Sequence, residues 1–415
     1  MEGNDLVADL DSFLARHQDE LIEFRRDLHA HPELANAEHR TTRRVALRLA
    51  AVGLRPVILP KGTGLIVDIG SESDGQGDRP VVALRADLDA LPMQDEKDVP
   101  YRSTVPNVCH ACGHDAHTTV LMGAGLYLAD LAAAGLLPGR VRLVFQPAEE
   151  AASGALDVLA AGGIASVGRI FALHCDPRLD AGQLGVRSGA ITAACDRIQV
   201  HVTGPGGHTA RPHLTTDLVY ALGKIITEVP AALSRRVDPR ASLSLVWGRV
   251  AAGAAANAIP DDGIVEGTVR CLDDEAWHQA PDMLKALVDS VASAYGVVAD
   301  VTYVRNVPPT VNEAISTAMV EAAADRVLGT DAIVPAPQSL GGEDFAWYLE
   351  SIPGALARLG TRKPGSGDDF DIHQPTFDVD ERAIGIGVKL MSATALTAMG
   401  SGPSASEPMP GVARA

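Results

Sequence analysis

The chain has 415 residues, more than one ordinary hydrophobic core accommodates, and this length predicts two domains. Hydrophobic residues make up 46% and charged residues 21% of the sequence, a composition typical of a folded globular protein. The formal net charge of −18 argues against nucleic acid or an anionic membrane surface as a partner. An anionic substrate would need a local positive centre.

The cysteines and the first residues indicate a reducing compartment. Five cysteines, an odd number, do not make a disulfide framework. Residues 1–5 lack the basic-then-apolar pattern of a signal peptide, and the sequence shows no uninterrupted apolar run of about 18 residues. We therefore predict a soluble cytoplasmic protein.

Helix-type and strand-type patterns alternate in the first half of the chain. Apolar positions recur at helical spacing across residues 6–30, and a second helix is predicted over about 41–52. Short β-type runs follow at 80–85, 140–145 and 169–173. This alternation predicts an α/β domain with helices on both faces of a sheet.

The pattern changes after residues 185–194, which we interpret as a hinge. Strands and helices are then predicted in the order β-α-β-β-α-β, over 196–202, 217–229, 242–247, 263–272, 275–295 and 297–304. That order indicates a ferredoxin-like unit, with four antiparallel strands and two helices on one face. The α/β pattern returns after residue 309, with helices over 312–328 and 381–399 and a strand over 355–360.

The predicted fold class is therefore α/β. A catalytic domain with a central mixed, largely parallel sheet flanked by helices carries an inserted ferredoxin-like (βαββαβ) lid domain. The expected boundaries are 1–187 and 306–399 for the catalytic domain and 188–305 for the lid. Residues 400–415, rich in Gly, Ser and Pro, are expected to form a disordered tail.

Residues 109–118 combine two thiols and three imidazoles around a glycine. Thiolate and imidazole are the donors that divalent transition metals prefer. The pair Cys109 and Cys112 could instead belong to a structural zinc site or a redox motif. A structural site needs a second cysteine pair, and the other cysteines are isolated in the sequence. A redox motif usually opens a helix after a strand, whereas these residues follow a predicted loop.

Each of the three early strands leads to a potential ligand. The first precedes Asp87 and Asp89, the second Glu149 and Glu150, and the third His174. Open α/β sheets place their sites at the carboxyl ends of strands, so we expect these side chains at one edge. A lone pair of glutamates is usually solvated surface, but this pair follows a buried-looking strand, which favours a functional role.

One more donor is needed, and His373 is the only histidine after His278. The predicted metal ligands are Cys112, His114, Glu150, His174 and His373. Five donors are too many for one tetrahedral zinc and fit two divalent ions if Cys112 bridges. Mixed sulfur, nitrogen and oxygen donors favour zinc or manganese and admit cobalt or nickel. Glu149 is the predicted general base, and Asp89 is predicted to orient a ligand.

Five segments together resemble the N-acyl-amino-acid amidohydrolases, in the hippurate hydrolase and auxin–amino-acid conjugate hydrolase branch of the aminoacylase/carboxypeptidase-like di-metal peptidases. They are residues 26–34, 85–92, 109–118, 145–150 and 342–345. The resemblance runs from about residue 20 to about 398 in the family's order. It implies two divalent ions, the same five ligands with Glu149 as base, and a lid that dimerises. Asp87 stands where the wider superfamily often has a histidine.

The resemblance also implies roles for three lid residues. His208, in the segment 204–208, would stabilise the tetrahedral oxyanion, often in the partner subunit's site; a loop histidine that caps a strand is the alternative. Asn257 and Arg270 lie in segments that hold the substrate's carboxylate, a task that suits an arginine fork. The family often has a glycine-rich run where this chain has residues 151–154, and a serine where this chain has Gly342. We expect these two departures from the family pattern to affect substrate choice.

The predicted activity is therefore hydrolysis of the amide bond of a small-molecule N-acyl-L-amino acid to a carboxylic acid and a free amino acid. We expect a homodimer joined through the lid, with neither nucleic acid nor membrane as partner. A metallo-dipeptidase with the same site is one alternative. A catalytically silent binding module is another, and the intact Glu149 and complete ligand set argue against it.

Overall fold

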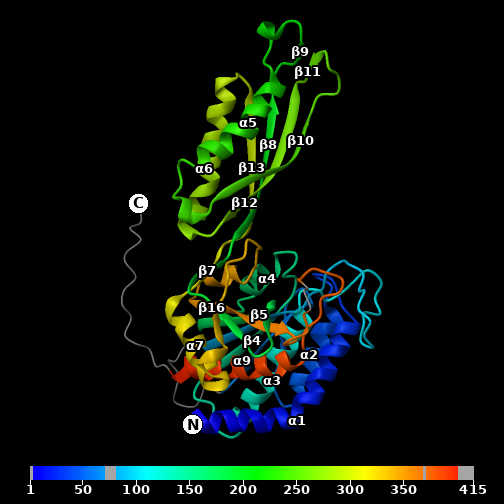
Figure 1. The fold of residues 1–415 in the computed structure, drawn as a ribbon, viewed down its shortest axis with the longest axis vertical. Helices are drawn as coiled ribbons and strands as arrows, with labels where there is room; N and C mark the ends of the chain where they lie inside the picture. Colours follow the sequence, from blue (N-terminus) through cyan, green and yellow to red (C-terminus); the bar gives the residue numbers. More distant parts are fainter. Residues whose placement is uncertain (1–2, 71–80, 368–370, 401–415) are drawn as a thin grey trace. The chain divides into compact units, whose positions relative to one another are not determined.

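A computed structural model describes residues 3–70, 81–367 and 371–400. Within them the chain divides into two compact units (Figure 1). Unit 1 takes in the described parts of Met1–Val186, Glu313–Ala336 and Ser351–Ala415, and unit 2 comprises Arg187–Asn312 and Pro337–Glu350.

The described part of unit 1 contains an eight-stranded sheet with the order β1-β2-β4-β3-β5-β16-β6-β15. Its strands are β1 Val57–Ile58, β2 Leu65–Ile69, β3 Val81–Asp87, β4 Val141–Gln146, β5 Val167–Asp180, β6 Leu184–Val186, β15 Ile333–Pro335 and β16 Gly354–Arg362. The central β3, β4, β5 and β16 run parallel, and antiparallel pairs join β1 to β2, β2 to β4 and β6 to β16. The predicted mixed, largely parallel sheet is confirmed.

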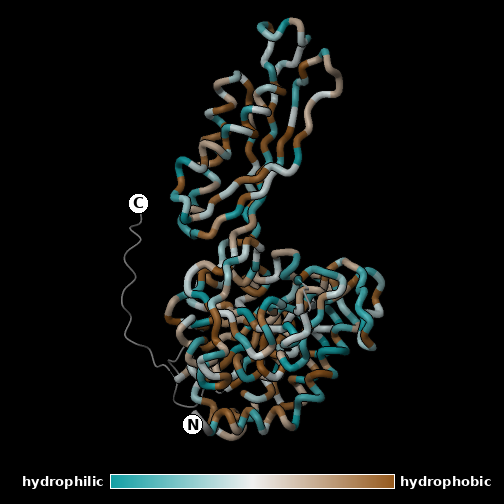
Figure 2. The backbone as a smooth tube through the Cα atoms, viewed as in Figure 1, coloured by the Kyte–Doolittle hydropathy of each residue, from teal (hydrophilic) through white to brown (hydrophobic). Residues whose placement is uncertain are grey.

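Helices cover this sheet, so β3 and β4 are buried along their whole length. The helices are α1 Gly3–Ala30, α2 His39–Ala50, α3 His114–Ala133, α4 Gly154–Ala160, α7 Ala314–Leu328 and α9 Arg382–Gly400, with a 3-10 turn η3 at Thr330–Ala332. In Figure 2, hydrophilic and hydrophobic residues alternate along α1, whose Leu10, Leu21 and Leu28 enter the core.

Helix α9 is long and apolar enough, by length and composition alone, to cross a membrane. Most of its residues are buried, and it packs against α3, α7 and the sheet. We therefore identify α9 as a core helix of unit 1. Arg382 and Lys389 interrupt its apolar sequence, so the sequence shows no continuous apolar run there.

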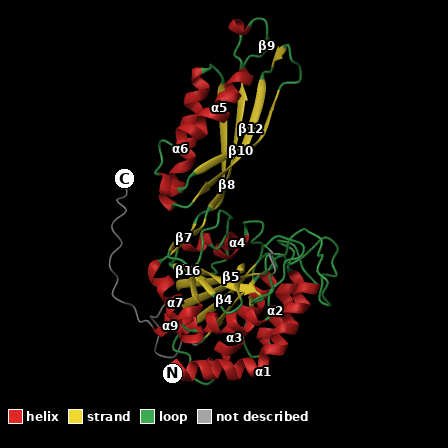
Figure 3. Ribbon diagram, viewed as in Figure 1, coloured by secondary structure: helices red, strands yellow, loops and turns green. Residues whose placement is uncertain are grey.

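Unit 2 contains the predicted ferredoxin-like arrangement. Its elements are β8 Ala194–Thr203, α5 Leu218–Leu233, β10 Ser244–Ala252, β12 Asp262–Cys271, α6 Asp274–Ala294 and β13 Val298–Val307. The strands form an antiparallel sheet in the order β10-β12-β8-β13, and α5 and α6 lie together on one face of it (Figure 3). Val200, Leu222 and Leu284 are among the residues that fill the core between these layers.

The remaining elements of unit 2 are short. They are β7 Gly189–Thr192, β9 Gly207–His208, β11 Ala258–Ile259, β14 Thr310–Asn312 and α8 Ala346–Leu349, with 3-10 turns η1 Pro212–Leu214 and η2 Pro239–Ala241. The segment interpreted as a hinge, 185–194, thus contributes strand residues to β6, β7 and β8.

The unit boundaries differ from the expected ones at two segments. Residues 306–312 and 337–350 belong to unit 2, although the sequence placed all of 306–399 in the catalytic domain. Trp347 helps to join these segments to unit 2, because its Nε1 donates to the Asn306 carbonyl at 3.0 Å and its ring packs on Trp277. The predicted tail, apart from Gly400, lies outside the described residues.

Candidate metal centre

Several segments of unit 1 converge where its central strands end. β3 leads to Asp89, β4 to Glu149 and Glu150, and β5 carries His174. The turn before α3 adds Cys112, and His114 is the first residue of that helix. His114 thus opens a helix, which the sequence did not predict, and the segment before it is the loop that the sequence predicted.

The five predicted donors form two groups that share one thiol. The donor atoms of Cys112, His114 and His174 lie within 4.8 Å of one another, and so do those of Cys112, Glu150 and His373. Cys112 Sγ is 3.5 Å from His174 Nε2, and His373 Nε2 is 3.4 Å from Glu150 Oε1. Sulfur, imidazole and carboxylate are donors that first-row divalent metals accept together.

Two of these donors are buried polar atoms without a hydrogen-bond partner, namely His114 Nε2 and Glu150 Oε1. An unsatisfied buried polar atom costs about 1–3 kcal/mol, which a bound cation would recover. Both central imidazoles are also oriented for coordination. Nδ1 of His114 donates to the Asp89 carbonyl at 2.9 Å and Nδ1 of His174 to the Cys175 carbonyl at 2.7 Å. Each ring thus presents Nε2 to the site.

Asp89 fixes the glutamate pair as well as His114. Its Oδ1 accepts the backbone N–H of Glu149 at 3.0 Å and its Oδ2 that of Glu150 at 2.9 Å. The preceding Ala148 has a left-handed backbone (φ 52°), and its N–H donates to Glu38 Oε1 at 2.7 Å. The pair is therefore held by carboxylates on two other segments.

Gly113 allows the turn that presents Cys112 and His114. Its φ is 89°, in the left-handed region, and a Cβ there would lie 2.7 Å from Cys175 Sγ. Any side chain at this position would push the turn away from β5. The glycine is thus required by both backbone conformation and space.

Burial and neighbouring charges shift the pKa values of three of the candidate donors. Burial, with help from Arg358, lowers the pKa of His174 well below its usual range, so the ring stays neutral. Burial raises the pKa of the Cys112 thiol, and a bound cation would favour its thiolate. Burial also opposes a charge on His114, but Asp87 and Cys112 outweigh it and raise its pKa.

His117 lies within the histidine-rich segment but had no predicted role. Its Nδ1 donates to Asp87 Oδ1 at 2.6 Å, and its Nε2 accepts the backbone N–H of Cys175 at 2.8 Å. His117 therefore joins β3 to the residue after His174. Its spacing of three from His114 on α3, one helical turn, is the signal that could have indicated this.

Cys109, the other half of the Cys-x-x-Cys pair, points to a different cluster. Its donor atom groups with those of His29 and Asp95, and its Sγ is 3.4 Å from Lys97 Nζ. Both thiols of the pair are free. Cys109 thus lies outside the two groups that the five predicted ligands form.

Unit 2 separates the predicted substrate-binding residues. His208 pairs with Ala258 in a short ladder, and the adjoining Asn257 carbonyl accepts the N–H of Thr209 at 3.3 Å. Arg270 lies near the opposite end of β12, roughly 25 Å along the strand. Its Nη1 donates to the Leu340 carbonyl at 3.0 Å. One chain therefore groups His208 with Asn257 and keeps Arg270 apart from them.

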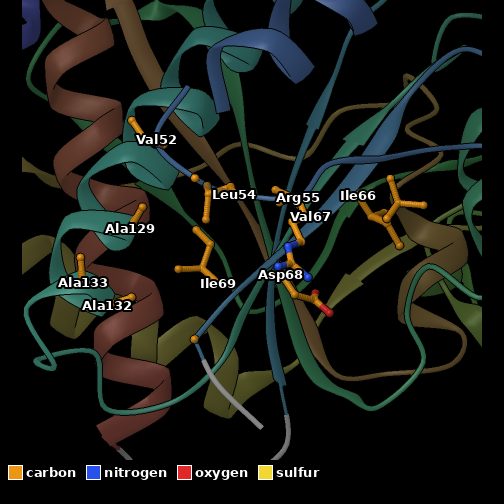
Figure 4. A pocket seen from close by; sticks show the side chains of 13 residues that line it. Val52, Leu54, Arg55, Ile66, Val67, Asp68, Ile69, Ala129, Ala132 and Ala133 are labelled. Carbon is orange, nitrogen blue, oxygen red and sulfur yellow. The ribbon is translucent and has the colours of Figure 1, made fainter. Parts of the chain in front are cut away.

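A surface pocket of about 460 Å³ lies elsewhere in unit 1 (Figure 4). Leu54, Ile69 and Ala133 are among the residues that line it. Ala133 ends α3, whose first residue is His114, so the length of the helix puts the pocket roughly 25 Å or more from the metal centre. Its carboxylate, Asp68, is paired with Arg142 at 2.6 Å. The pocket is distinct from the metal centre.

Residues 83–397 match the profile described as Peptidase family M20/M25/M40. The chain belongs to this family. The protein is thus a hydrolase, as predicted, with the fold of the M20 peptidases.

Similar proteins agree with this assignment. An N-acetyl-L-cysteine deacetylase of Bacillus subtilis is 38% identical over 373 residues, which cover 89% of this chain and 86% of the relative. The Bacillus subtilis YXEP protein, a dinuclear metal binding peptidase from the M20 family, superposes with a TM-score of 0.81 at 33% identity, covering 93% of this chain and 99% of that one.

A longer relative comes from Rhodococcus jostii and is provisionally named glutamate–cysteine ligase 2-3. It is 48% identical over 374 residues. These cover 90% of this chain but 46% of the relative, so the chain spans less than half of that protein.

Proposed function

We propose that this M20 hydrolase is a two-metal amidohydrolase that cleaves N-acyl-L-amino acids to a carboxylic acid and a free amino acid. It would stand in the hippurate and auxin–amino-acid conjugate hydrolase branch. The observation that carries the proposal is the pair of three-donor groups that share Cys112, with Glu149 Oε2 only 3.9 Å from His114 Nε2.

The donor set fits two divalent ions, zinc or manganese first and cobalt or nickel next. Cys112, His114 and His174 would hold one ion, and Cys112, Glu150 and His373 the other, with the thiolate shared. Such ions, when bound, act as Lewis acids toward a carbonyl and lower the pKa of water. The similar Bacillus subtilis peptidase, which is dinuclear, supports this count.

Glu149 is proposed as the general base. It lies beside the metal ligand Glu150, and Asp89 holds its backbone N–H at 3.0 Å. Its carboxylate would take the proton of the attacking water and return it to the departing amine. Because the proton is removed while the water attacks, a free hydroxide ion does not have to form first.

Unit 2 would supply the groups that recognise the substrate. His208 is proposed to stabilise the oxyanion, and Asn257 and Arg270 to hold the substrate's carboxylate. Since one chain keeps Arg270 apart from the other two, we propose a homodimer through unit 2 in which His208 and Asn257 act in the partner's site. The dimer would act on small molecules in the cytoplasm, with neither nucleic acid nor membrane as partner.

A substrate panel tests the proposal. Acetyl-, benzoyl- and indoleacetyl-amino acids are compared with free dipeptides, each with zinc, manganese, cobalt and nickel, and Glu149→Gln protein is the blank. We expect release of free amino acid from at least one N-acyl-amino acid, and the deacetylase relative favours the acetyl group. Faster cleavage of dipeptides would support the dipeptidase alternative, which the family's peptidases motivate. No turnover of any compound would overturn the enzymatic proposal.

A further inference from the structure

Arg25, near the end of α1, connects two segments that carry metal-ligand candidates. Its side chain is 1% exposed. Its Nε donates to Asp115 Oδ2 at 2.7 Å, and Asp115 directly follows His114. Its Nη2 donates to Asp378 Oδ1 at 2.6 Å, and Asp378 lies five residues after His373. One buried guanidinium thus spans the start of α3 and the loop that carries His373.

The loop with His373 needs such support. His373 has a left-handed backbone (φ 62°), which residues other than glycine rarely adopt. Its side chain is 48% exposed. Its backbone N–H donates to the Ala111 carbonyl at 2.7 Å. Phe377 and Val379, on either side of Asp378, are buried in a small apolar cluster. Packing, the backbone bonds of His373 and Pro375 and the ion pair of Asp378 therefore hold the candidate ligand in place.

Both carboxylates accept a hydrogen bond from the Arg25 guanidinium, Asp115 at 2.7 Å and Asp378 at 2.6 Å. Burial opposes the charge of Asp378, and Arg25 is the strongest group that lowers its pKa. A planar guanidinium donates in two directions at once, which a lysine ammonium on a flexible stem reproduces poorly.

Asp115 and Asp378 do not depend equally on Arg25. Asp115 also accepts from His29 Nδ1 at 2.7 Å, within the buried interior. Asp378 has the Tyr101 hydroxyl at 2.7 Å as its other side-chain partner. Loss of the arginine fork should therefore loosen the His373 loop more than the start of α3.

We propose that Arg25 is a positioning residue that sets the affinity for the ion held by Cys112, Glu150 and His373. It does so by fixing the His373 loop against the turn before α3. The group of Cys112, His114 and His174 does not include that loop and should depend on Arg25 less. This inference rests on the proposed two-metal function.

The neighbouring cluster of His29, Asp95 and Cys109 does not provide another metal site. The Lys97 ammonium lies 3.0 Å from Asp95 Oδ1 and 3.4 Å from Cys109 Sγ. It places a positive charge where a metal cation would have to bind, so the cluster already contains its cation. Arg25 therefore acts on the centre around Cys112.

The test compares Arg25→Lys with Arg26→Lys. Arg26 is the adjacent arginine, 42% exposed, and its Nε and Nη2 pair with Glu381 at 2.7 and 2.6 Å. Both ion affinities are measured on substrate-free protein by competition of zinc with a chromophoric chelator. We expect Arg25→Lys to weaken one ion by about 10- to 100-fold and the other by less than about threefold. Arg26→Lys should change neither, and excess zinc should restore turnover of Arg25→Lys to near wild type.

Asp378→Asn keeps the test decisive if Arg25→Lys folds poorly. Asparagine retains the acceptor for Tyr101 and removes the charge that Arg25 binds, so the same ion should weaken by a smaller factor. Melting temperatures of the metal-free proteins are recorded alongside. Two ions bound with wild-type affinity in both variants, or two ions weakened equally with a lower melting temperature, would overturn the inference. A wild-type protein that binds one ion or none would instead overturn the proposed function.

Discussion

Glu149 and Glu150 are chemically identical neighbours that are held in different surroundings. The carboxylate of Glu150 lies 3.4 Å from His373 Nε2, within a three-donor group that includes Cys112. Glu149 Oε2 lies 3.9 Å from His114 Nε2. The proposed ligand Glu150 and the proposed base Glu149 can therefore be distinguished by mutation, because each substitution should remove only one of the two roles.

Glu149→Gln should keep the metal content and lower kcat by several orders of magnitude, because an amide cannot accept the proton of water. Glu150→Gln should lose metal affinity instead, since it removes an anionic donor. Both variants are assayed for bound metal and turnover side by side. Equal metal loss in the two proteins, or an active Glu149→Gln enzyme, would contradict the assignment.

A second prediction concerns Glu38, which supports the turn before Glu149 by accepting the Ala148 N–H. Burial, with a contribution from Asp89, raises its pKa from 4.5 to about 7. The folded protein thus binds this proton more tightly than the unfolded chain. The resulting stability is fully present below pH 4.5 and is lost as the pH rises to about 7.

Glu38→Gln removes this titration and keeps an acceptor for Ala148. Relative to wild type, its unfolding free energy should rise between pH 4.5 and about 7, by on the order of 3 kcal/mol, and then level off. Urea unfolding of the metal-free proteins from pH 4.5 to 8 measures the difference. A difference that is independent of pH would show that Glu38 does not titrate in this window.

At the residue scale, the sequence predicted the candidate donors but not the residues that support them. Glu150 and His174 could be predicted because their residue types suit a metal and they follow strand-like runs, and Cys112 because it lies in a segment rich in thiols and imidazoles. The role of Arg25 could not, since its partners Asp115 and Asp378 lie 90 and 353 residues away in sequence. Contacts of this kind leave no local pattern.

At the scale of elements, the strands and amphipathic helices were predictable, and α3 was not. Almost every residue of α3 is buried, so its sequence lacks the polar face that marks a surface helix. Strand β7 was missed for another reason. It has four residues, Gly189–Thr192, and pairs with the distant β14, so its glycine and small residues indicated a hinge.

Strand β12 presents Arg270 for the proposed carboxylate contact. Arg270→Ala should raise KM or abolish turnover for N-acyl-amino acids, because it removes a charge-assisted bond. The loss should be much smaller on a matched amide without the carboxylate, where wild type lacks that bond as well. Steady-state kinetics of wild type and Arg270→Ala on the two substrates measure this difference. An equal loss on both would show that Arg270 supports the fold of unit 2 rather than the substrate.

At the scale of the whole molecule, the order of the predicted elements indicated that unit 2 is inserted in unit 1. It did not indicate that a later segment belongs to unit 2 as well. Residues 337–350 rejoin unit 2 through Trp347, the Leu340 carbonyl and a bridge between Ser339 and Thr192. No sequence periodicity signals a segment that is held by such scattered side-chain and backbone contacts.

The proposed exchange of His208 between subunits can be tested by mixing variants. His208→Ala and Glu149→Gln proteins should each be inactive, and heterodimers should regain part of the activity. Each mixed dimer would contain one site with both wild-type groups. Subunit exchange is verified with differently tagged chains. If exchange occurs without recovery, His208 acts within its own subunit or outside catalysis.

The central claim is that two ions in the centre around Cys112 are required for amide hydrolysis. Its most direct test is a titration of metal-free protein with zinc or manganese while free amino acid released from an N-acyl-amino acid is measured. The account predicts that turnover rises with added metal and saturates at about two ions per chain. Full turnover without metal, or saturation at one ion, would contradict it.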